Sequence, residues 1–166
     1  MALNVTLRSN AKSVQKQINR FFNKFPTITR KGLAQAGFNL VAIIRQLTNK
    51  GKDIRRIPFE LYSDAYEKRL QREGKKTAVD LFYTGKMLGS LTTKVHTNRR
   101  ASVFFNRTAE MKKALFNQVT REPKREFFGF DKRTEKIIQR NFVKFVEKEL
   151  RKFKVWVTEK TSQIIY

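Results

Sequence analysis

The residues of this chain that could support nucleotide chemistry form only an incomplete phosphate-binding pattern. Gly85-Lys86 comes closest to a Walker A motif, in which backbone amides cradle phosphates and a hydroxyl holds magnesium. That motif requires glycine where Asp80 stands and serine or threonine where Met87 stands. The sequence therefore gives no basis for a bound nucleotide.

Candidates for metal or acid–base catalysis are equally sparse. His96 is the only histidine, so no second imidazole is available for a metal pair, and we expect it to be a solvated residue beside a turn. Glu122 and Glu126 lie among Arg and Lys, which favours surface ion pairs over proton transfer. The absence of cysteine removes thiolate ligands, thiol nucleophiles and disulfides together. We therefore predict a protein that is not an enzyme and has no cofactor and no metal.

Positive charge is the strongest compositional feature. The chain has 37 Lys and Arg against 14 Asp and Glu, a formal net charge of +23, which is typical of proteins that contact a polyanion or an acidic surface. The first acid is Asp53, so the preceding third of the chain carries charge of one sign.

Four of these early basic residues fall in one arc of a helix at 100° per residue, and we call them the basic stripe: Lys12, Lys16, Arg20 and Lys24. The opposite arc holds Val14, Ile18, Phe21 and Phe25, which we expect to be buried in the core. We expect the basic stripe to face DNA phosphates or an acidic partner, unless it is merely solvated or acids of later segments cover it.

Length and hydrophobic content predict one folded domain. The chain has 166 residues, of which 40% are hydrophobic, including 15 Phe. This content is sufficient for a hydrophobic core, so we expect a folded domain with a charged surface and not a disordered basic chain. We assign residues 1–157 to this domain and residues 158–166 to a C-terminal tail. No stretch has the length of a signal peptide core or a membrane span, so we expect no membrane partner.

Hydrophobic periodicity predicts the elements that must position the candidate residues. Leu3, Val5 and Leu7 alternate with polar residues and predict a short strand. A helix is expected from about residue 10 to Pro26, and a second, central helix from Thr27 or Thr29 to about residue 49.

The second half of the chain predicts a hairpin and a closing helix. Residues 91–95 and 102–105 flank a polar turn, which indicates a β-hairpin. Asp131 can cap a helix with one apolar stripe, and residues 153–157 indicate a last strand. The predicted fold class is α+β, a small antiparallel sheet with a central hairpin, packed by two N-terminal helices and a C-terminal helix.

Three ordered motifs lie between Pro58 and Phe130. The first is Pro58 followed by Tyr62-Ser63-Asp64-Ala65-Tyr66 and Lys68-Arg69. The second is residues 81–91, LFYTGKMLGSL, and it leads directly into the hairpin. The third joins residues 114–118, ALFNQ, to residues 123–129, PKREFFG, ahead of the closing helix.

In order and spacing, these motifs resemble those of the head–tail joining proteins of long-tailed bacteriophages. This family of neck or tail-completion proteins includes the phage virion-morphogenesis proteins, and its patterns are Leu-x-x-Thr-Gly-x-Leu-x-x-Ser-Leu, Ala-x-x-His-Gln and Pro-x-Arg-x-Phe-h-Gly. The chain departs from them by placing Asn117 where histidine is usual, by lacking a glycine after Gln118 and by extending past the last helix.

The resemblance implies a structural virion protein without catalysis. It implies a homo-oligomeric ring, hexamer or dodecamer, in the neck or at the head-proximal tail end, assembled in the host cytoplasm. The implied partners are copies of the chain, adjacent connector or stopper proteins, tail-terminator or tail-tube proteins, and the phage genome in the lumen. The motif residues that it singles out for folding or subunit contact are Thr84, Gly85, Met87, Ser90, Leu91, Gln118, Arg125, Phe127, Phe128 and Gly129.

The same residues also have a reading that does not depend on the family. Thr84 and Gly85 suit a tight turn needed for folding. Phe127, Phe128 and Phe130 either all anchor the closing helix or leave one ring for a neighbour. The alternative function is a sequence-independent nucleic-acid-binding protein, which the charge favours, although no zinc spacing or RNA-recognition signature accompanies it.

Overall fold

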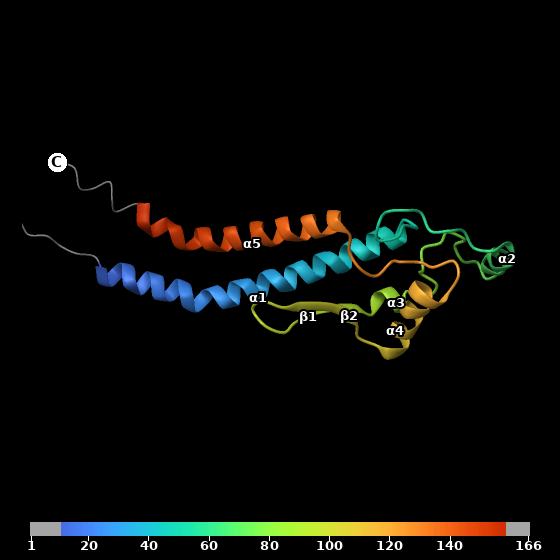
Figure 1. Ribbon diagram of the computed structural model, residues 1–166, viewed down its shortest axis with the longest axis horizontal. Coiled ribbons are helices and arrows are strands. Elements are labelled where there is room, and N and C mark those ends of the chain that lie inside the picture. Colours follow the sequence, from blue (N-terminus) through green and yellow to red (C-terminus); the bar gives the residue numbers. More distant parts are fainter. Residues whose placement is uncertain (1–10, 159–166) are drawn as a thin grey trace, which may run out of the picture.

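Two long helices and a β-hairpin dominate the fold. The computed structural model describes residues 11–158, in which α1 (Ala11–Asn49) and α5 (Lys132–Thr158) run antiparallel and side by side (Figure 1). The hairpin packs on α1, so that α1 lies between it and much of α5 (Figure 1). None of the described helices is long and apolar enough to cross a lipid bilayer.

The helix α1 continues through Pro26, so the prediction of two N-terminal helices is wrong. A proline inside a helix removes one hydrogen bond and costs about 3 kcal/mol. Packing directly after it favours continuity, because Ile28 is buried and a Cβ added to Gly32 would lie 2.8 Å from Phe142 Cε2 of α5. The Thr29 hydroxyl donates hydrogen bonds to the carbonyls of Phe25 and Pro26. Tertiary contact between α1 and α5 thus overrides the local stop signal.

The predicted hairpin is confirmed. Strands β1 (Leu91–Val95) and β2 (Ala101–Phe105) pair antiparallel, with Leu91 opposite Phe105 and Val95 opposite Ala101. The backbone of α1 comes close to β1 at Gly37, where an added Cβ would lie 2.0 Å from Thr93 Oγ1. Glycine at this position therefore sets the spacing between helix and hairpin.

The sheet is smaller than predicted. Within residues 11–158 it has only the two hairpin strands. The strand predicted at residues 153–157 is wrong, because α5 continues to Thr158 and thereby also crosses the predicted boundary between domain and tail. The strand predicted at Leu3–Leu7 lies outside the described residues.

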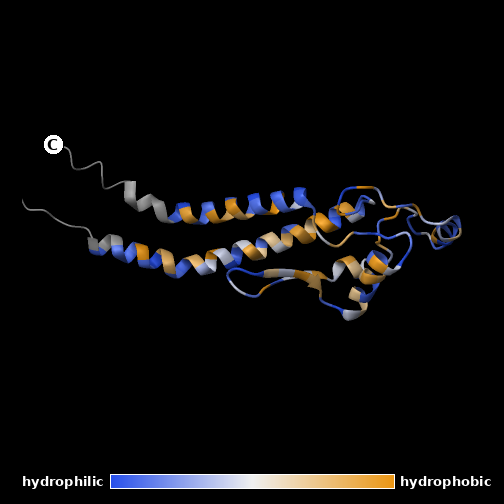
Figure 2. Cartoon of the chain, in the orientation of Figure 1, coloured by the Kyte–Doolittle hydropathy of each residue, from blue (hydrophilic) through white to orange (hydrophobic). Residues whose placement is uncertain are grey.

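Short helices complete the end of the molecule around the core. They are α2 (Asp64–Arg72), α3 (Lys86–Gly89), α4 (Thr108–Leu115) and a single π-helical turn, η1 (Phe116–Thr120). The core lies where the second half of α1 meets the hairpin and α3, and apolar residues concentrate there (Figure 2). Its most buried members include Ile44, Leu88, Leu91 and Phe127. Helices on one face of a small antiparallel hairpin confirm the α+β class.

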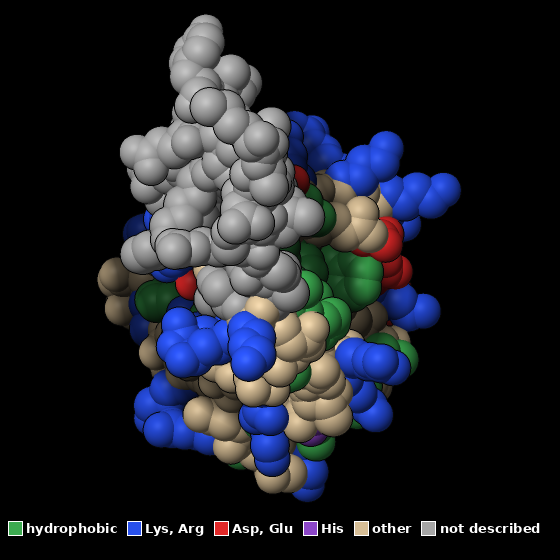
Figure 3. Space-filling view, turned by 90° about the vertical axis from the view of Figure 1, so that its left-hand side faces the viewer, with side chains coloured by type: hydrophobic (Ala, Val, Ile, Leu, Met, Phe, Trp, Pro, Cys, Tyr) green, Lys and Arg blue, Asp and Glu red, His purple; other side chains and the backbone are tan. Residues whose placement is uncertain are grey.

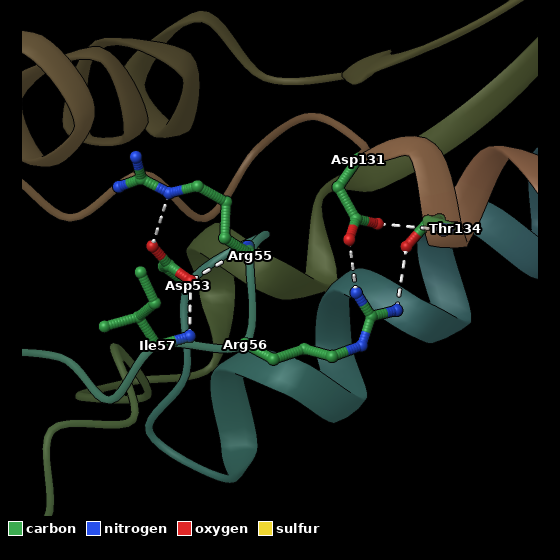
Figure 4. A network of polar contacts seen from close by, with 6 residues as sticks. All are labelled: Asp53, Arg55, Arg56, Ile57, Asp131 and Thr134. Carbon is green, nitrogen blue, oxygen red and sulfur yellow. Dashed lines mark hydrogen bonds and ion pairs between the residues drawn. The ribbon is translucent and has the colours of Figure 1, made fainter.

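A polar network joins the loop after α1 to the start of α5 (Figure 4). The Arg56 guanidinium donates to Asp131 Oδ2 at 2.6 Å and to Thr134 Oγ1 at 3.1 Å. Asp131 also accepts a hydrogen bond from the Thr134 backbone N–H, so its predicted role as the helix cap is confirmed. Burial raises the pKa of the Asp131 carboxyl, but hydrogen bonds from Thr134 and Arg56 outweigh burial and leave the pKa below its ordinary value.

The loop itself is held by Asp53. Its buried carboxylate accepts hydrogen bonds from the backbone N–H groups of Arg55 and Ile57, both at 2.8 Å, and from Arg55 Nε (Figure 4). The Ile54 backbone N–H donates to the carbonyl of Glu126, which ties the loop to the segment before α5. The first acid in the sequence thus fixes a turn and does not neutralise the basic stripe.

Candidate assembly surfaces

The Thr84-Gly85 motif forms the turn that opens α3. Gly85 has a φ of 70°, in the left-handed region that favours glycine, and an added Cβ would lie 2.7 Å from Phe82 Cζ. The Thr84 hydroxyl accepts a hydrogen bond from the Lys86 backbone N–H at 3.4 Å. These contacts give the motif a role in folding.

The remainder of this motif points into the protein. Met87 and Leu91 are buried members of the core, and the Ser90 hydroxyl is buried and donates to the Met87 carbonyl at 2.8 Å. The buried side chains of this motif therefore anchor both α3 and β1 in the core. None of these three side chains offers a surface to a partner.

The third motif is held together by Gln118. Its side-chain amide donates to the Phe128 carbonyl at 2.8 Å and accepts from the Phe128 N–H at 2.9 Å. Gly129 follows with a φ of 152°, a conformation that side-chain-bearing residues rarely adopt. The sequence brought Gln118 and Phe128 into one candidate set, and the structure places them in direct contact.

Arg125 lies inside the protein, which is unusual for arginine. Its Nη2 donates to the Glu60 carbonyl at 3.4 Å, and the guanidinium lies over the Tyr62 ring, 4.8 Å from its centroid. Burial lowers the pKa of Arg125, and burial likewise raises the pKa of Tyr62. Arg125 thus links the third motif to the first, which contains Tyr62.

The three clustered phenylalanines separate into inward and outward residues. Phe127 is 1% exposed, and Phe128 is half-buried with its ring 5.1 Å from that of Phe105 on β2. Phe130 is 57% exposed. Two rings therefore anchor the segment to the hairpin, and one faces outward.

The basic stripe is exposed, as expected, but the opposite arc is not buried. Ile18 and Phe25 are exposed, Phe21 is half-buried, and Phe22 between them is 64% exposed. The prediction that this arc belongs to the core is therefore wrong for Ile18 and Phe25, and the side chain of Val14 lies outside the described part of the structure. Among the described elements, α1 extends past the hairpin and here has α5 alone beside it (Figure 1). We call this projecting part the stalk, residues 11–32 of α1 and 140–158 of α5.

Figure 3 views the molecule from the stalk end. Lys and Arg side chains surround the described surface, with apolar side chains open between them and few acids. Seen from this end, the molecule presents positive charge and apolar area together.

Sequence reasoning missed a second apolar surface, on α4 and η1. Its members are all exposed, and we call them the α4 patch: Met111, Leu115, Phe116 and Val119. Met111, Leu115 and Val119 are spaced four residues apart, so the helical period was present in the sequence. Lysines interrupt the apolar residues of this stretch, which weakens the helical signal.

No cluster of metal-binding side chains accompanies these surfaces in the part of the chain that the structure describes. Over residues 11–158, no three His, Cys, Asp or Glu side chains lie close enough to hold a metal ion. His96 is exposed, and its Nε2 lies 2.8 Å from the Ser102 hydroxyl.

Comparison with known proteins identified no relative, since no protein-family model, curated protein or solved structure matches the chain.

Proposed function

We propose that the protein is a structural subunit of a long-tailed bacteriophage particle, forming a ring at the head–tail junction that completes the tail and joins it to the head. The three ordered motifs support this proposal through their resemblance to neck and tail-completion proteins. Arg125 of the third motif also lies over the ring of Tyr62 of the first, and Phe127 of the third motif packs edge-on against Phe105 of the hairpin. The motifs thus contribute to the fold of a single subunit.

The observation that carries the proposal is that two apolar surfaces are exposed on different elements. One is the stalk arc with Ile18, Phe22 and Phe25, and the other is the α4 patch. Large exposed apolar patches mark interaction sites in folded proteins. A ring closes through head-to-tail contacts, which require two different surfaces on each subunit. The pair of surfaces is therefore what a ring subunit needs.

The size and shape of purified assemblies test the proposal. The full chain is measured by native mass spectrometry and imaged by negative-stain electron microscopy, where rings of six or twelve copies are expected. The double variants Phe22→Ser with Phe25→Ser, and Leu115→Ser with Val119→Ser, should each reduce assembly. Leu61→Ser is the control, because Leu61 is 79% exposed but belongs to neither surface.

A monomer at every concentration would overturn the proposal. The second candidate, a sequence-independent nucleic-acid-binding protein, is favoured by the net charge of +23. A protein that stays monomeric alone and coats DNA of any sequence, with affinity falling steeply as salt rises, would support that candidate instead.

A further inference from the structure

A groove of about 570 Å³ runs beside β2. Its strand wall is Ala101, Ser102 and Val103, whereas within the described residues β1 contributes nothing to it. The opposite walls come from α1, from the segment that leads into α5 and from the first turns of α5, and they include Leu33, Leu40, Phe128, Phe130 and Ile138. The groove is therefore a mainly apolar trough along the outer edge of the hairpin.

The backbone at this edge has unused hydrogen-bonding groups. Asn106 N–H donates to the Ser90 carbonyl and His96 N–H to the Arg100 carbonyl, both at 2.9 Å. Because bonded and non-bonded pairs alternate in an antiparallel ladder, the N–H and C=O groups of Ala101, Val103 and Phe105 must point away from β1. Over residues 11–158 these groups form no hydrogen bond. An open edge of this kind is a template for another strand.

The sequence contains a segment suited to this edge. Leu3, Val5 and Leu7 alternate with Asn4 and Thr6, so in an extended conformation the three apolar side chains share one face. We propose that the Leu3–Leu7 segment of a neighbouring copy adds to the edge of β2 as a third strand and places its apolar side chains in the groove. Main-chain hydrogen bonds supply affinity in this mode of recognition, and pockets for alternate side chains supply specificity.

Chain length excludes the segment of the same copy. Leu33, at the near end of the groove, follows Ala11 by 22 residues of α1, which corresponds to about 33 Å. Leu7 precedes Ala11 by four residues, which span at most about 14 Å even when fully extended. The start of α1 also lies at the far end of the molecule from the core (Figure 1). The strand must therefore be exchanged between copies, one given and one received by each subunit, which suits a closed ring.

The inference rests on the self-association proposed above, and variants on the two faces of the segment test it. Val5→Ser with Leu7→Ser removes side chains that would enter the groove. Asn4→Ser with Thr6→Ser changes the other face and is the matched control. In native mass spectrometry over a dilution series, the first pair should raise the concentration at which half the copies are assembled about tenfold or more, and the second should leave it within about twofold.

Disulfide trapping gives the geometry, and the chain has no cysteine of its own to interfere. Copies with only Asn4→Cys or Thr6→Cys are mixed with copies that have only Phe104→Cys, a partly exposed position on β2. Oxidation should give a mixed dimer, and Lys152→Cys in place of Phe104→Cys should not. Rings that assemble normally with Val5 and Leu7 replaced, or that yield no mixed dimer, would overturn the strand exchange while leaving the proposed ring intact. A wild-type chain that is always monomeric would overturn both.

Discussion

The side-chain amide of Gln118 holds the backbone of Phe128 through both of its polar atoms. It donates to the carbonyl and accepts from the N–H, at 2.8 and 2.9 Å. The Gln118 side chain therefore makes the two hydrogen bonds to Phe128 that the backbone of a neighbouring β-strand would otherwise make. This contact fixes the segment that inserts Phe127 into the core.

Replacing Gln118 should destabilise the fold more than replacing a glutamine that is exposed. Gln118→Ala leaves two partly buried backbone groups of Phe128 without partners, and we expect the free energy of unfolding to fall by about 1–3 kcal/mol. Gln139 is the control, because it is exposed and its side-chain amide donates to the Glu135 carboxylate within the same helix. Gln139→Ala should change the unfolding free energy by less than about 0.5 kcal/mol. Equal urea midpoints for the two variants would show that the Gln118 contact contributes nothing.

Replacing Phe127 or Phe130 should change the free energy of unfolding by different amounts in the same unfolding experiment. Phe127→Ala opens a cavity in the core, since Phe127 is 1% exposed, and should lower the unfolding free energy by about 3–5 kcal/mol. Phe130→Ala removes a ring that is 57% exposed and should cost under about 1 kcal/mol in the isolated chain. A large loss of stability for the dilute Phe130 variant would contradict its assignment as an outward residue.

Close packing between α1 and β1 predicts a strong effect of one added methyl group. Gly37→Ala would place its Cβ 2.0 Å from Thr93 Oγ1 and 2.8 Å from Thr93 Cβ, so helix and hairpin must separate. We expect a loss of about 1–3 kcal/mol in the free energy of unfolding, read from thermal melts. Gly89→Ala is the matched control, because no atom lies within 4 Å of its added Cβ. Equal melting temperatures for the Gly37 and Gly89 variants would contradict the close approach of α1 to β1.

Acid should loosen the segment that follows α2. The Glu73 carboxylate accepts hydrogen bonds from Arg69 Nε at 2.9 Å and from the Tyr83 hydroxyl at 2.7 Å, which lower its pKa from 4.5 to about 2. Because the folded pKa is depressed, this contribution to stability is fully present above pH 4.5 and is lost as the pH falls towards about 2.

Amide hydrogen exchange of residues 74–84 measures that change. Protection in this segment should fall over the window from pH 4.5 to about 2, relative to protection in the hairpin of the same sample. Glu73→Gln should remove this dependence on pH. Protection that stays constant through the window in the unmodified chain would show that the carboxylate does not hold Tyr83.

The positive charge of the basic stripe should support head–tail joining or DNA retention because of where it lies on the stalk, and not only through the net charge of the protein. Changing Lys12, Lys16, Arg20 and Lys24 to Gln removes four positive charges from the stalk, and we expect weaker head–tail joining or DNA retention with a reduced dependence on salt. The control removes the same charge outside the stalk, from Lys132, Arg133 and Lys136 at the exposed start of α5 and from the exposed Lys68 of α2. Circular dichroism first verifies the fold of both variants. Identical losses in the two would point to net charge alone, and unchanged joining at every salt concentration would contradict the prediction.

The elements that the sequence predicted well are those whose signals are local. The hairpin followed from a polar turn between two short apolar runs, and β1 and β2 lie where these runs predict. The α5 start followed from Asp131, whose carboxylate caps the helix within three residues of chain. Such signals need no knowledge of the tertiary structure.

The predictions that failed depended on distant contacts. Pro26 is a helix stop by local rules, but packing of α1 against α5 keeps the helix continuous. The arc with Ile18 and Phe25 has the period of a buried face, but periodicity says only that one side is apolar and not what covers it. Residues 153–157 have short-range strand character that the rest of α5 overrides.

The sequence identified important residues of the candidate site but did not show whether they stabilise the fold or contact a partner. Gln118, Arg125 and Phe127 were singled out from motif spacing, and the structure places all of them in contacts that maintain the fold. The α4 patch was not predicted, although its spacing was readable. Motifs of this kind contain residues that stabilise the fold of the subunit. Which exposed surfaces contact a partner depends on the assembly, and the motifs do not indicate it.

The proline within α1 gives the stalk a mechanical character. With 39 residues α1 is about 58 Å long, and such a rod transmits a push along its axis to the hairpin with little compression. Sideways, its stiffness is lowest near Pro26, where one backbone hydrogen bond is missing and the Thr29 hydroxyl competes for the carbonyls of Phe25 and Pro26. We therefore expect any bending of α1 under a load on its outer end to concentrate near Pro26, away from the hairpin.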